Sequence, residues 1–368
     1  MVDTHVAKDS TTTFAGRIKL EDVARAAGVS TATASRVLNH PDIVRPGLRE
    51  KVTRAMTELS YTRDGAARAL KLGRMRTIGA VVPTLNISIF AEGVEALQNR
   101  LSEQGYTLFI ANSQYDVLKE LGEVRALLER GIDGLVLVGD TFSDEVLQLV
   151  RQHGVPLVTT YVGAARDGVP AIGIDNAEAT SQLTRYLLGL GHRDFGVIAN
   201  LQPSNDRSRA RHDGILRALE EAGIQLDSSR IIKVTHSLVQ GRSGLHQLLM
   251  THPTITAVIC TTDTLAMGAI AEARSLALTV PRDLSITGFD DIELASQMSP
   301  ALTTVSVPAA EIGRSAADHL INALSGVPIP VSVQLPYRLV LRGSTGPAPA
   351  KRPQVFGRRR TKMAPIDA

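Results

Sequence analysis

The chain has 368 residues, 43% of them hydrophobic, which predicts two or three domains with substantial cores and excludes an intrinsically disordered protein. Its single cysteine, Cys260, excludes an intramolecular disulfide, and we find neither a secretory signal nor an apolar run of about 20 residues, so we expect a cytoplasmic protein outside the membrane. The net charge of +3 is unevenly distributed: residues 1–76 hold 14 Lys and Arg against 8 Asp and Glu, residues 77–345 hold 20 against 28, and residues 346–368 hold 6 against 1.

The first predicted domain, residues 17–61, has the pattern of a helix-turn-helix. In LEDVARAAGVSTATASRVLN, apolar residues recur at helical spacing, stop at Gly28 and resume after Ser30. Glycine suits the positive φ that ends a helix, and serine is a good N-cap for the next helix, expected over about 31–38. Its outer face, free of acidic residues, carries Thr31, Ala32, Thr33, Ser35 and Arg36.

Short hydroxyl side chains and a guanidinium are suited to base edges in the major groove of DNA. An ordinary helical hairpin in a core is the alternative, but it does not explain a polar, acid-free face in a basic segment. A solvated basic surface is likewise the alternative for the charge alone. A third helix is expected over 46–60, with basic side chains for solvent or phosphate, and residues 62–76 read by themselves as a basic linker.

From residue 77 to 345, buried strands alternate with helices. Strands are expected in TIGAVVP, YTLFIA, IDGLVLV, FGVIA, RIIKV, TAVIC and LSITGF, and FAEGVEALQNRLSEQG is expected to be a helix. Helices are also expected near 116–130, 211–222 and 266–276. Continuous apolar strands indicate parallel sheets covered on both faces, and the length indicates two α/β lobes. We expect the chain to cross between the lobes near 162–174, near 289–302, and beyond Val327.

Parallel sheets bind ligands at the carboxyl ends of their strands, so loops there should line a cleft between the lobes. These loops are 84–90, Tyr161, 205–211, His236, 262–263 and 289–291. The run NDRSRAR brings Arg207, Arg209 and Arg211 close together. Two guanidiniums at the mouth of a cleft would favour an anionic ligand, although Arg207 and Arg209 could instead pair with Asp206 and Asp213 at the surface.

Together, DVARAAGVSTATASRVLN, REKVTRAMTELSY, AARALK, RGIDGLVLVG, IDN, LGLGHRDFGVI, TAVICTTDTLAMGAIAEARSLALTVPRDLSITGFDD and PALTTV resemble the lactose-repressor/purine-repressor (LacI/GalR) family of bacterial transcription regulators. The resemblance runs from about residue 17 to 345. It implies an α-helical helix-turn-helix head and an α/β, two-lobed, periplasmic-binding-protein-like body with parallel sheets. It also implies that residues 62–76 contain a hinge helix, although Arg63 stands where a proline often precedes that helix.

The resemblance assigns base selection to Thr31, Ala32 and Arg36. It makes Leu70 a wedge in the minor groove, where the alternative is a leucine that anchors the linker. The complete set of predicted DNA-binding residues is Ser30, Thr31, Ala32, Thr33, Ser35, Arg36, Asn39, Arg68 and Leu70.

In the body, the resemblance makes Arg211 a ligand clamp and Asp290 an acceptor for ligand hydroxyls or amines. Thr262 departs from the asparagine common there, and Asp263 and Asp290 have helix capping as their alternative. His236 has an ordinary loop histidine as its alternative, and Phe90 has core packing. The predicted effector-binding residues are Phe90, Tyr161, Asn205, Arg207, Arg211, His236, Thr262, Asp263 and Asp290.

The expected function is therefore that of a homodimeric transcription regulator, a repressor, that binds palindromic double-stranded operator DNA and a small-molecule effector such as a sugar or sugar acid. The sequence contains no catalytic motif, metal-binding motif or cofactor motif, so we expect no enzyme activity. A solute-binding protein of a transport system is the alternative, and it would not need the basic head. Residues 1–16 and 346–368 are expected to be disordered, the latter as a basic tail.

Overall fold

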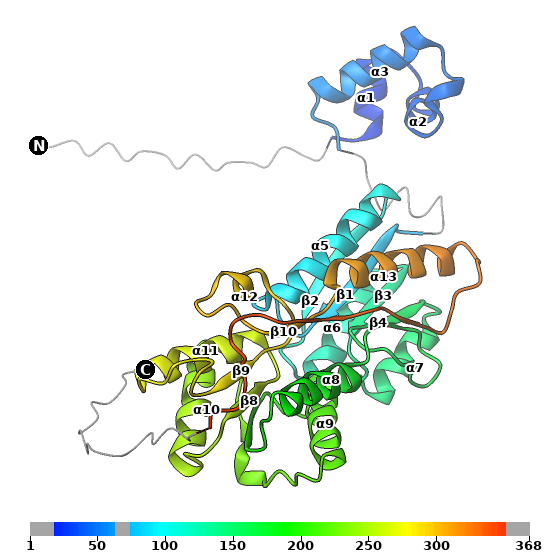
Figure 1. Ribbon diagram of the computed structural model, residues 1–368. Coiled ribbons are helices and arrows are strands. Elements are labelled where there is room, and N and C mark those ends of the chain that lie inside the picture. Colours follow the sequence, from blue (N-terminus) through cyan, green and yellow to red (C-terminus); the bar gives the residue numbers. More distant parts are fainter. Residues whose placement is uncertain (1–17, 63–73, 351–368) are drawn as a thin grey trace, which may run out of the picture. The chain divides into compact units, whose positions relative to one another are not determined.

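The computed structural model describes residues 18–62 and 74–350, and the chain divides into two compact units after Met75. Figure 1 shows both units in the colours of the sequence. The predicted hinge residues Arg68 and Leu70 lie outside the described residues. Within the described residues, no helix is both long enough and apolar enough to span a bilayer.

The first unit is a small bundle of three α-helices, as the sequence predicts. Gly28 has a φ of +66°, and Ser30 Oγ accepts a hydrogen bond of 3.1 Å from Thr33 N, so both the break and the N-cap are confirmed. Val23, Ala34 and Val52 pack in its core. Its elements are α1 (Leu20–Ala26), α2 (Thr31–Asn39), η1 (Pro41–Ile43) and α3 (Pro46–Glu58).

The first lobe of the second unit contains a parallel sheet in the order β11-β5-β4-β3-β1-β2. Alternate residues of its central strands enter two separate cores, so helices cover both faces. Helices α5 (Ser88–Glu103) and α13 (Ala309–Leu324) lie side by side on one face, and α6 (Val117–Glu129) and α7 (Asp144–Gln152) cover the other (Figure 1). The strands are β1 (Thr77–Val82), β2 (Thr107–Asn112), β3 (Gly134–Val138), β4 (Leu157–Thr160), β5 (Ala171–Gly173) and β11 (Ser332–Gln334).

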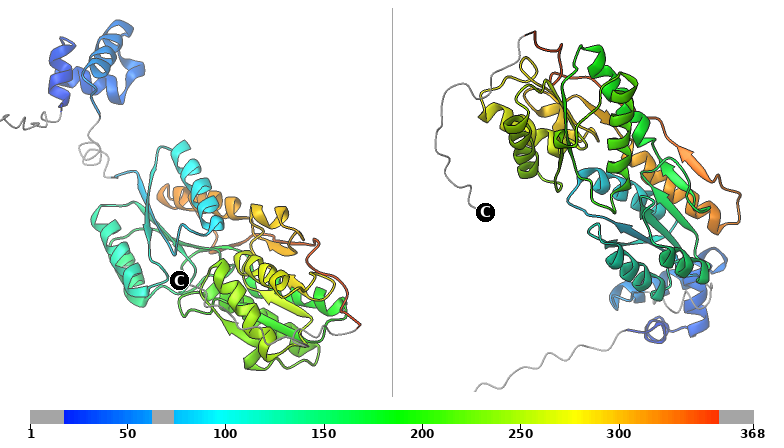
Figure 2. Two further views of the ribbon diagram at one scale, coloured as in Figure 1. Left: turned by 90° about the vertical axis from the view of Figure 1, so that its left-hand side faces the viewer. Right: turned by 90° about the horizontal axis from the view of Figure 1, so that it is seen from below.

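The second lobe is built in the same way around a smaller parallel sheet in the order β7-β6-β8-β9. Helices α8 (Asn176–Gly189) and α9 (Asp206–Glu221) pack on one face, and α10 (Leu238–Thr251) and α11 (Asp263–Ser275) pack on the other. The two views of Figure 2 show this lobe beside the first one, joined by several crossing segments. The remaining elements are β6 (Phe195–Ala199), β7 (Ile231–Lys233), β8 (Ala257–Cys260), β9 (Ser285–Thr287) and η2 (Ser228–Arg230).

The chain crosses between the lobes three times: the first crossing falls at the end of its predicted range, 162–174, and the second falls later than predicted. Strand β5 still belongs to the first sheet, so the first crossing follows it and lies near residue 174. The second crossing follows β10 (Thr304–Ser306), because α12 (Glu293–Gln297) still packs on the second lobe. The third lies between β11 and β12 (Arg338–Val340), where β12 pairs antiparallel with β10, beyond Val327 as predicted.

One predicted strand is not covered on both faces. Strand β2 lies at the edge of the first sheet, and Phe109 and Ile110 each keep 40% of their surface exposed. Helix boundaries also differ: α9 begins at Asp206, five residues before the predicted start, and α11 begins at Asp263. Asn205 and Thr262 cap these helices, so residues expected in loops belong to first helical turns.

Candidate functional site

The exposed face of α2 is the candidate DNA-binding surface of the first unit. Thr31, Ala32, Arg36 and Asn39 are exposed, and α2 contains no acidic residue. Ser30 caps the helix, and Thr33 and Ser35 are half-buried. Asn39 is exposed, but its Nδ2 donates to Ser35 O at 2.9 Å. Thr31, Ala32 and Arg36 are the positions at which the α2 face can offer side chains to base edges.

In the second unit, a narrow cavity lies in the cleft between the lobes, with about 30 Å³ of free volume, which is room for roughly one water molecule. Seven of the nine predicted effector-binding residues line it. Of the four further lining residues, Ile87, Ile89 and Ser208 lie in the loops 84–90 and 205–211 that the sequence predicts at the cleft, and Tyr115 was not predicted. The lining consists of Ile87, Ile89, Phe90, Tyr115, Tyr161, Asn205, Arg207, Ser208, Arg211, Thr262 and Asp290.

Arg211 and Asp290 form a buried ion pair in the cavity, with Arg211 Nη1 at 3.1 Å from Asp290 Oδ1. The guanidinium also stacks on Phe289, with Cζ 3.7 Å from the ring centroid. Burial raises the pKa of Asp290 to about 6, although Arg211 opposes the shift. Asp290 has a φ of +116°, an unusual conformation for a residue with a side chain.

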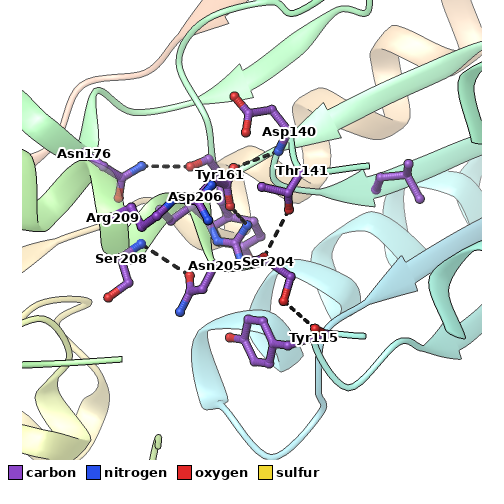
Figure 3. Close-up of polar contacts among 12 residues, drawn as sticks. Tyr115, Asp140, Thr141, Tyr161, Asn176, Ser204, Asn205, Asp206, Ser208 and Arg209 are labelled. Carbon is purple, nitrogen blue, oxygen red and sulfur yellow. Dashed lines mark hydrogen bonds and ion pairs between the residues drawn. The ribbon is translucent and has the colours of Figure 1, made fainter. Parts of the chain in front are cut away.

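Asn176 fixes this ion pair, and sequence reasoning did not single it out. Its Oδ1 accepts a hydrogen bond of 2.9 Å from Arg211 Nε, and its Nδ2 donates to Tyr161 O at 2.9 Å. Asn176 therefore joins Tyr161, the first residue after β4 of the first lobe (Figure 3), to Arg211 on α9 of the second lobe. Its place in the IDN triplet was the signal that could have identified it.

Phe90 and Tyr161 form the aromatic wall of the cavity. Their rings meet edge to face, with centroids 5.2 Å apart and planes at 87°. The Tyr161 hydroxyl donates to Ile89 O at 2.8 Å, so the ring faces the cavity while the hydroxyl is used within the protein.

Arg207 lies in the first turn of α9, beside this wall. Its Nη1 contacts Asp206 Oδ1 at 2.5 Å, and its Cζ lies 5.8 Å from the centroid of the Phe90 ring. Burial lowers the pKa of Arg207, but Asp206, Tyr115 and Asp140 together outweigh burial and raise this pKa. The pair is buried, so the alternative of a surface pairing between Arg207 and Asp206 is wrong.

Two predicted effector-binding residues do not line the cavity. Asp263 is fully buried and accepts hydrogen bonds from Ile292 N at 2.9 Å and Thr304 Oγ1 at 2.5 Å, so its carboxylate is used inside the second lobe. Burial raises the pKa of Asp263 to about 7. His236 is half-buried, and burial and the nearby Arg211 lower its pKa.

Three hydrogen bonds cross the cleft beside the cavity and join the lobes (Figure 3). Asp140 N donates to Asp206 Oδ2 at 2.7 Å, Thr141 Oγ1 donates to Ser204 O at 3.1 Å, and Ser204 Oγ donates to Tyr115 O. We call these three bonds the lobe latch. Among the described residues, no group of three or more His, Cys, Asp or Glu side chains is arranged to hold a metal ion.

A helix-turn-helix unit followed in one chain by a two-lobed body with a polar cleft defines the class of ligand-responsive DNA-binding regulators. Residues 19–64 match the family described as bacterial regulatory proteins, lacI family, and residues 75–340 match the periplasmic binding proteins and sugar binding domain of LacI family. The chain belongs to the lacI family, so the predicted family and fold class are confirmed.

Relatives and solved structures agree with this assignment. The HTH-type transcriptional repressor PurR of Serratia proteamaculans (strain 568) is 36% identical over 307 residues, which is 83% of this chain and 90% of the relative. The lac repressor dimer bound to operator and the anti-inducer ONPF is similar with a TM-score of 0.81 and 27% identity, covering 90% of this chain and 99% of that one. The transcription regulator GntR from Chromobacterium violaceum has a TM-score of 0.70 and 32% identity, covering 73% and 99%.

Proposed function

We propose that this protein is a transcriptional repressor of the bacterial cytoplasm that binds a palindromic operator as a homodimer. In this proposal residues 17–61 bind DNA, 62–76 form the hinge, and 77–345 bind the effector and the partner subunit. Thr31, Ala32 and Arg36 contact bases, and an effector between the lobes controls operator affinity. The proposal rests above all on the exposed, acid-free face of α2 in a chain that also carries the cleft.

Two copies are needed because one short helix makes few base contacts, and two-fold symmetry doubles them on a palindrome. A surface suited to pairing is available at the edge of the first lobe. Phe109, Ile110, Val117 and Leu118 at β2 and the start of α6 keep 40%, 40%, 38% and 79% of their surface exposed. Burial of such a patch against a second copy would remove apolar area from water.

The test is fluorescence anisotropy of the full chain on its own upstream DNA and on single-base variants of the bound site, at fixed salt. Arg36→Ala should reduce discrimination at one base position by about 1–3 kcal/mol, because a guanidinium pairs with guanine through two hydrogen bonds. Arg25→Ala is the matched control, since Arg25 lies on α1 and pairs with Asp22 at 3.2 Å. Arg25→Ala should change the affinity for the operator and for its single-base variants equally. If Arg36→Ala keeps the selectivity of the native protein, the assignment of α2 as the DNA-reading helix is wrong.

The second candidate function, a solute-binding protein, shares the two-lobed body. Deletion of residues 1–76 separates the two: a transport receptor should keep its ligand affinity and have no DNA binding to lose, whereas a regulator should lose its operator. We also propose that the protein has no catalytic activity, in keeping with the repressors among its relatives.

A further inference from the structure

We propose that the effector is an oxyanion, a small metabolite with a carboxylate or phosphate group, and that Arg207 receives this group. The inference rests on the proposed function, because it names the ligand class of the same cleft. It follows from the charge of the cavity lining, the free end of the Arg207 guanidinium and the position of Arg207 in α9.

The cavity lining carries more positive than negative charge. Of its eleven residues, Arg207 and Arg211 are cations, and Asp290 is the one carboxylate. Asp290 is committed to Arg211 at 3.1 Å. A buried guanidinium in a cavity walled by Phe90 and Tyr161 is costly unless an anion and hydrogen-bond acceptors surround it. Asp206, the carboxylate that pairs with Arg207, is not among the lining residues, so Arg207 meets no carboxylate within the lining except the one committed to Arg211.

Arg207 also has an unused donor. Its side chain is only 4% exposed, and Nη1 is taken by Asp206, but Nη2 is buried without a hydrogen-bond partner among the described residues. Buried donors without partners are rare because each loses its hydrogen bonds to water. An oxyanion at Nη2 would satisfy this donor without displacing Asp206.

The local backbone holds the guanidinium in place. Gly139, with a φ of +89°, lies so close to Arg207 Nη1 that a Cβ at this position would collide with it. Arg207 also belongs to the first turn of a 16-residue helix, where the helix dipole favours a negative charge. The side chain is therefore preorganised, and an anion there gains from both the guanidinium and the helix end.

A second cavity, which Arg207 also lines, is the wrong place for an anion. It has about 240 Å³ of free volume, but its lining includes Asp140, Asp175 and Asp206 with Arg207 as the one cation. Three carboxylates repel an oxyanion, so the smaller cavity is the binding site. Its volume of about 30 Å³ is too small for a sugar acid, so the ligand enters when the lobes separate.

The experiment is isothermal titration of the full-length protein at fixed ionic strength with gluconate, galactonate, glucuronate, citrate, glucose 6-phosphate and ribose 5-phosphate. Glucose, galactose, ribose and hypoxanthine are the uncharged comparisons. We expect at least one oxyanion to bind about 10-fold or more tightly than its uncharged parent. Gluconate against glucose 6-phosphate distinguishes a carboxylate from a phosphate as the recognised group.

The variants then test Arg207 itself. Arg207→Gln should weaken the oxyanion about 10- to 100-fold, Arg207→Lys should retain part of the affinity, and Arg217→Gln should bind as the native protein does. Arg217 is the matched control because it lies on the same helix and pairs at the surface with Glu178. Circular dichroism checks the folding of each variant. If Arg207→Gln does not fold, the inference is tested by the affinity of Arg207→Lys and by the native protein's affinity for oxyanions relative to their uncharged parents.

Binding of an uncharged compound with none of the oxyanions, no binding of any oxyanion, or equal oxyanion affinity in folded Arg207→Gln would each overturn the inference. These outcomes leave the proposed function untouched. Operator binding is measured on the ligand-free protein, so a failure there is recognised separately.

Discussion

Asp263 is a carboxyl group whose protonation should affect stability. Burial raises its pKa to about 7 in the folded protein, against an ordinary value of 3.8. The folded state therefore favours the neutral acid. The contribution of neutral Asp263 to the free energy of unfolding is fully present below about pH 4 and is lost as the pH rises through 7. Asp263→Asn removes this titration while keeping an acceptor for Ile292 N and a donor toward Thr304.

We expect the free energy of unfolding of Asp263→Asn, relative to the native protein, to rise by about 2–3 kcal/mol between pH 5 and pH 8. Urea denaturation across this range measures it. Asp263→Ala is the control: it should show the same trend at lower stability, because it loses the titration and the hydrogen bonds together. A constant difference between Asp263→Asn and the native protein would show that Asp263 is ionised throughout.

At this scale, the sequence could locate residues near the cleft but not their orientation. Arg211, Asp290 and Tyr161 were predicted from their places after strands, since parallel strands end at one edge of a sheet. Asp263 has the same kind of place, yet its carboxylate faces Ile292 and Thr304. Which way a side chain points depends on contacts distant in sequence, and no local pattern encodes them.

The close pair of helices α5 and α13 depends on glycine at the element scale. A Cβ on Gly313 would collide with the carbonyl oxygen of Gly93, which is backbone and cannot rotate away. Gly313→Ala should therefore destabilise the protein by about 3 kcal/mol, measured by urea denaturation. Gly122→Ala is the matched control, since nothing lies within 4 Å of its Cβ position on α6, and it should stabilise by about 0.5–1 kcal/mol.

If Gly313→Ala were no less stable than the native protein within experimental error, the two helices could separate at little cost in free energy.

The α5–α13 pair also shows what the sequence could not predict among the elements. Helical periodicity marked α5, but its partner lies more than 200 residues away, and α13 was not anticipated. The late second crossing has the same cause: residues 293–297 read as a connection until the packing of α12 on the second lobe is known.

For the whole molecule, the lobe latch determines how readily the cleft opens. Asp206 is its central member, because the carboxylate accepts from Asp140 N at 2.7 Å across the cleft and holds Arg207 at 2.5 Å. Asp206→Asn removes the charge from both contacts. A hydrogen bond to a charged group contributes about 1.5–3 kcal/mol, so the open arrangement should gain roughly 10- to 100-fold in population relative to the closed one.

Fluorescence energy transfer between dyes on the two lobes measures this population. Cysteines introduced as Glu145→Cys on α7 and Glu220→Cys on α9 are exposed, whereas the native Cys260 is buried and should not react. Asp213→Asn is the matched control, because it makes the same change on the same helix at a side chain 72% exposed. Lower transfer in Asp206→Asn than in the control would make the latch part of the conformational response. Equal transfer would mean that the crossing segments alone hold the lobes together, and lobe closure would then depend on the effector and not on these contacts.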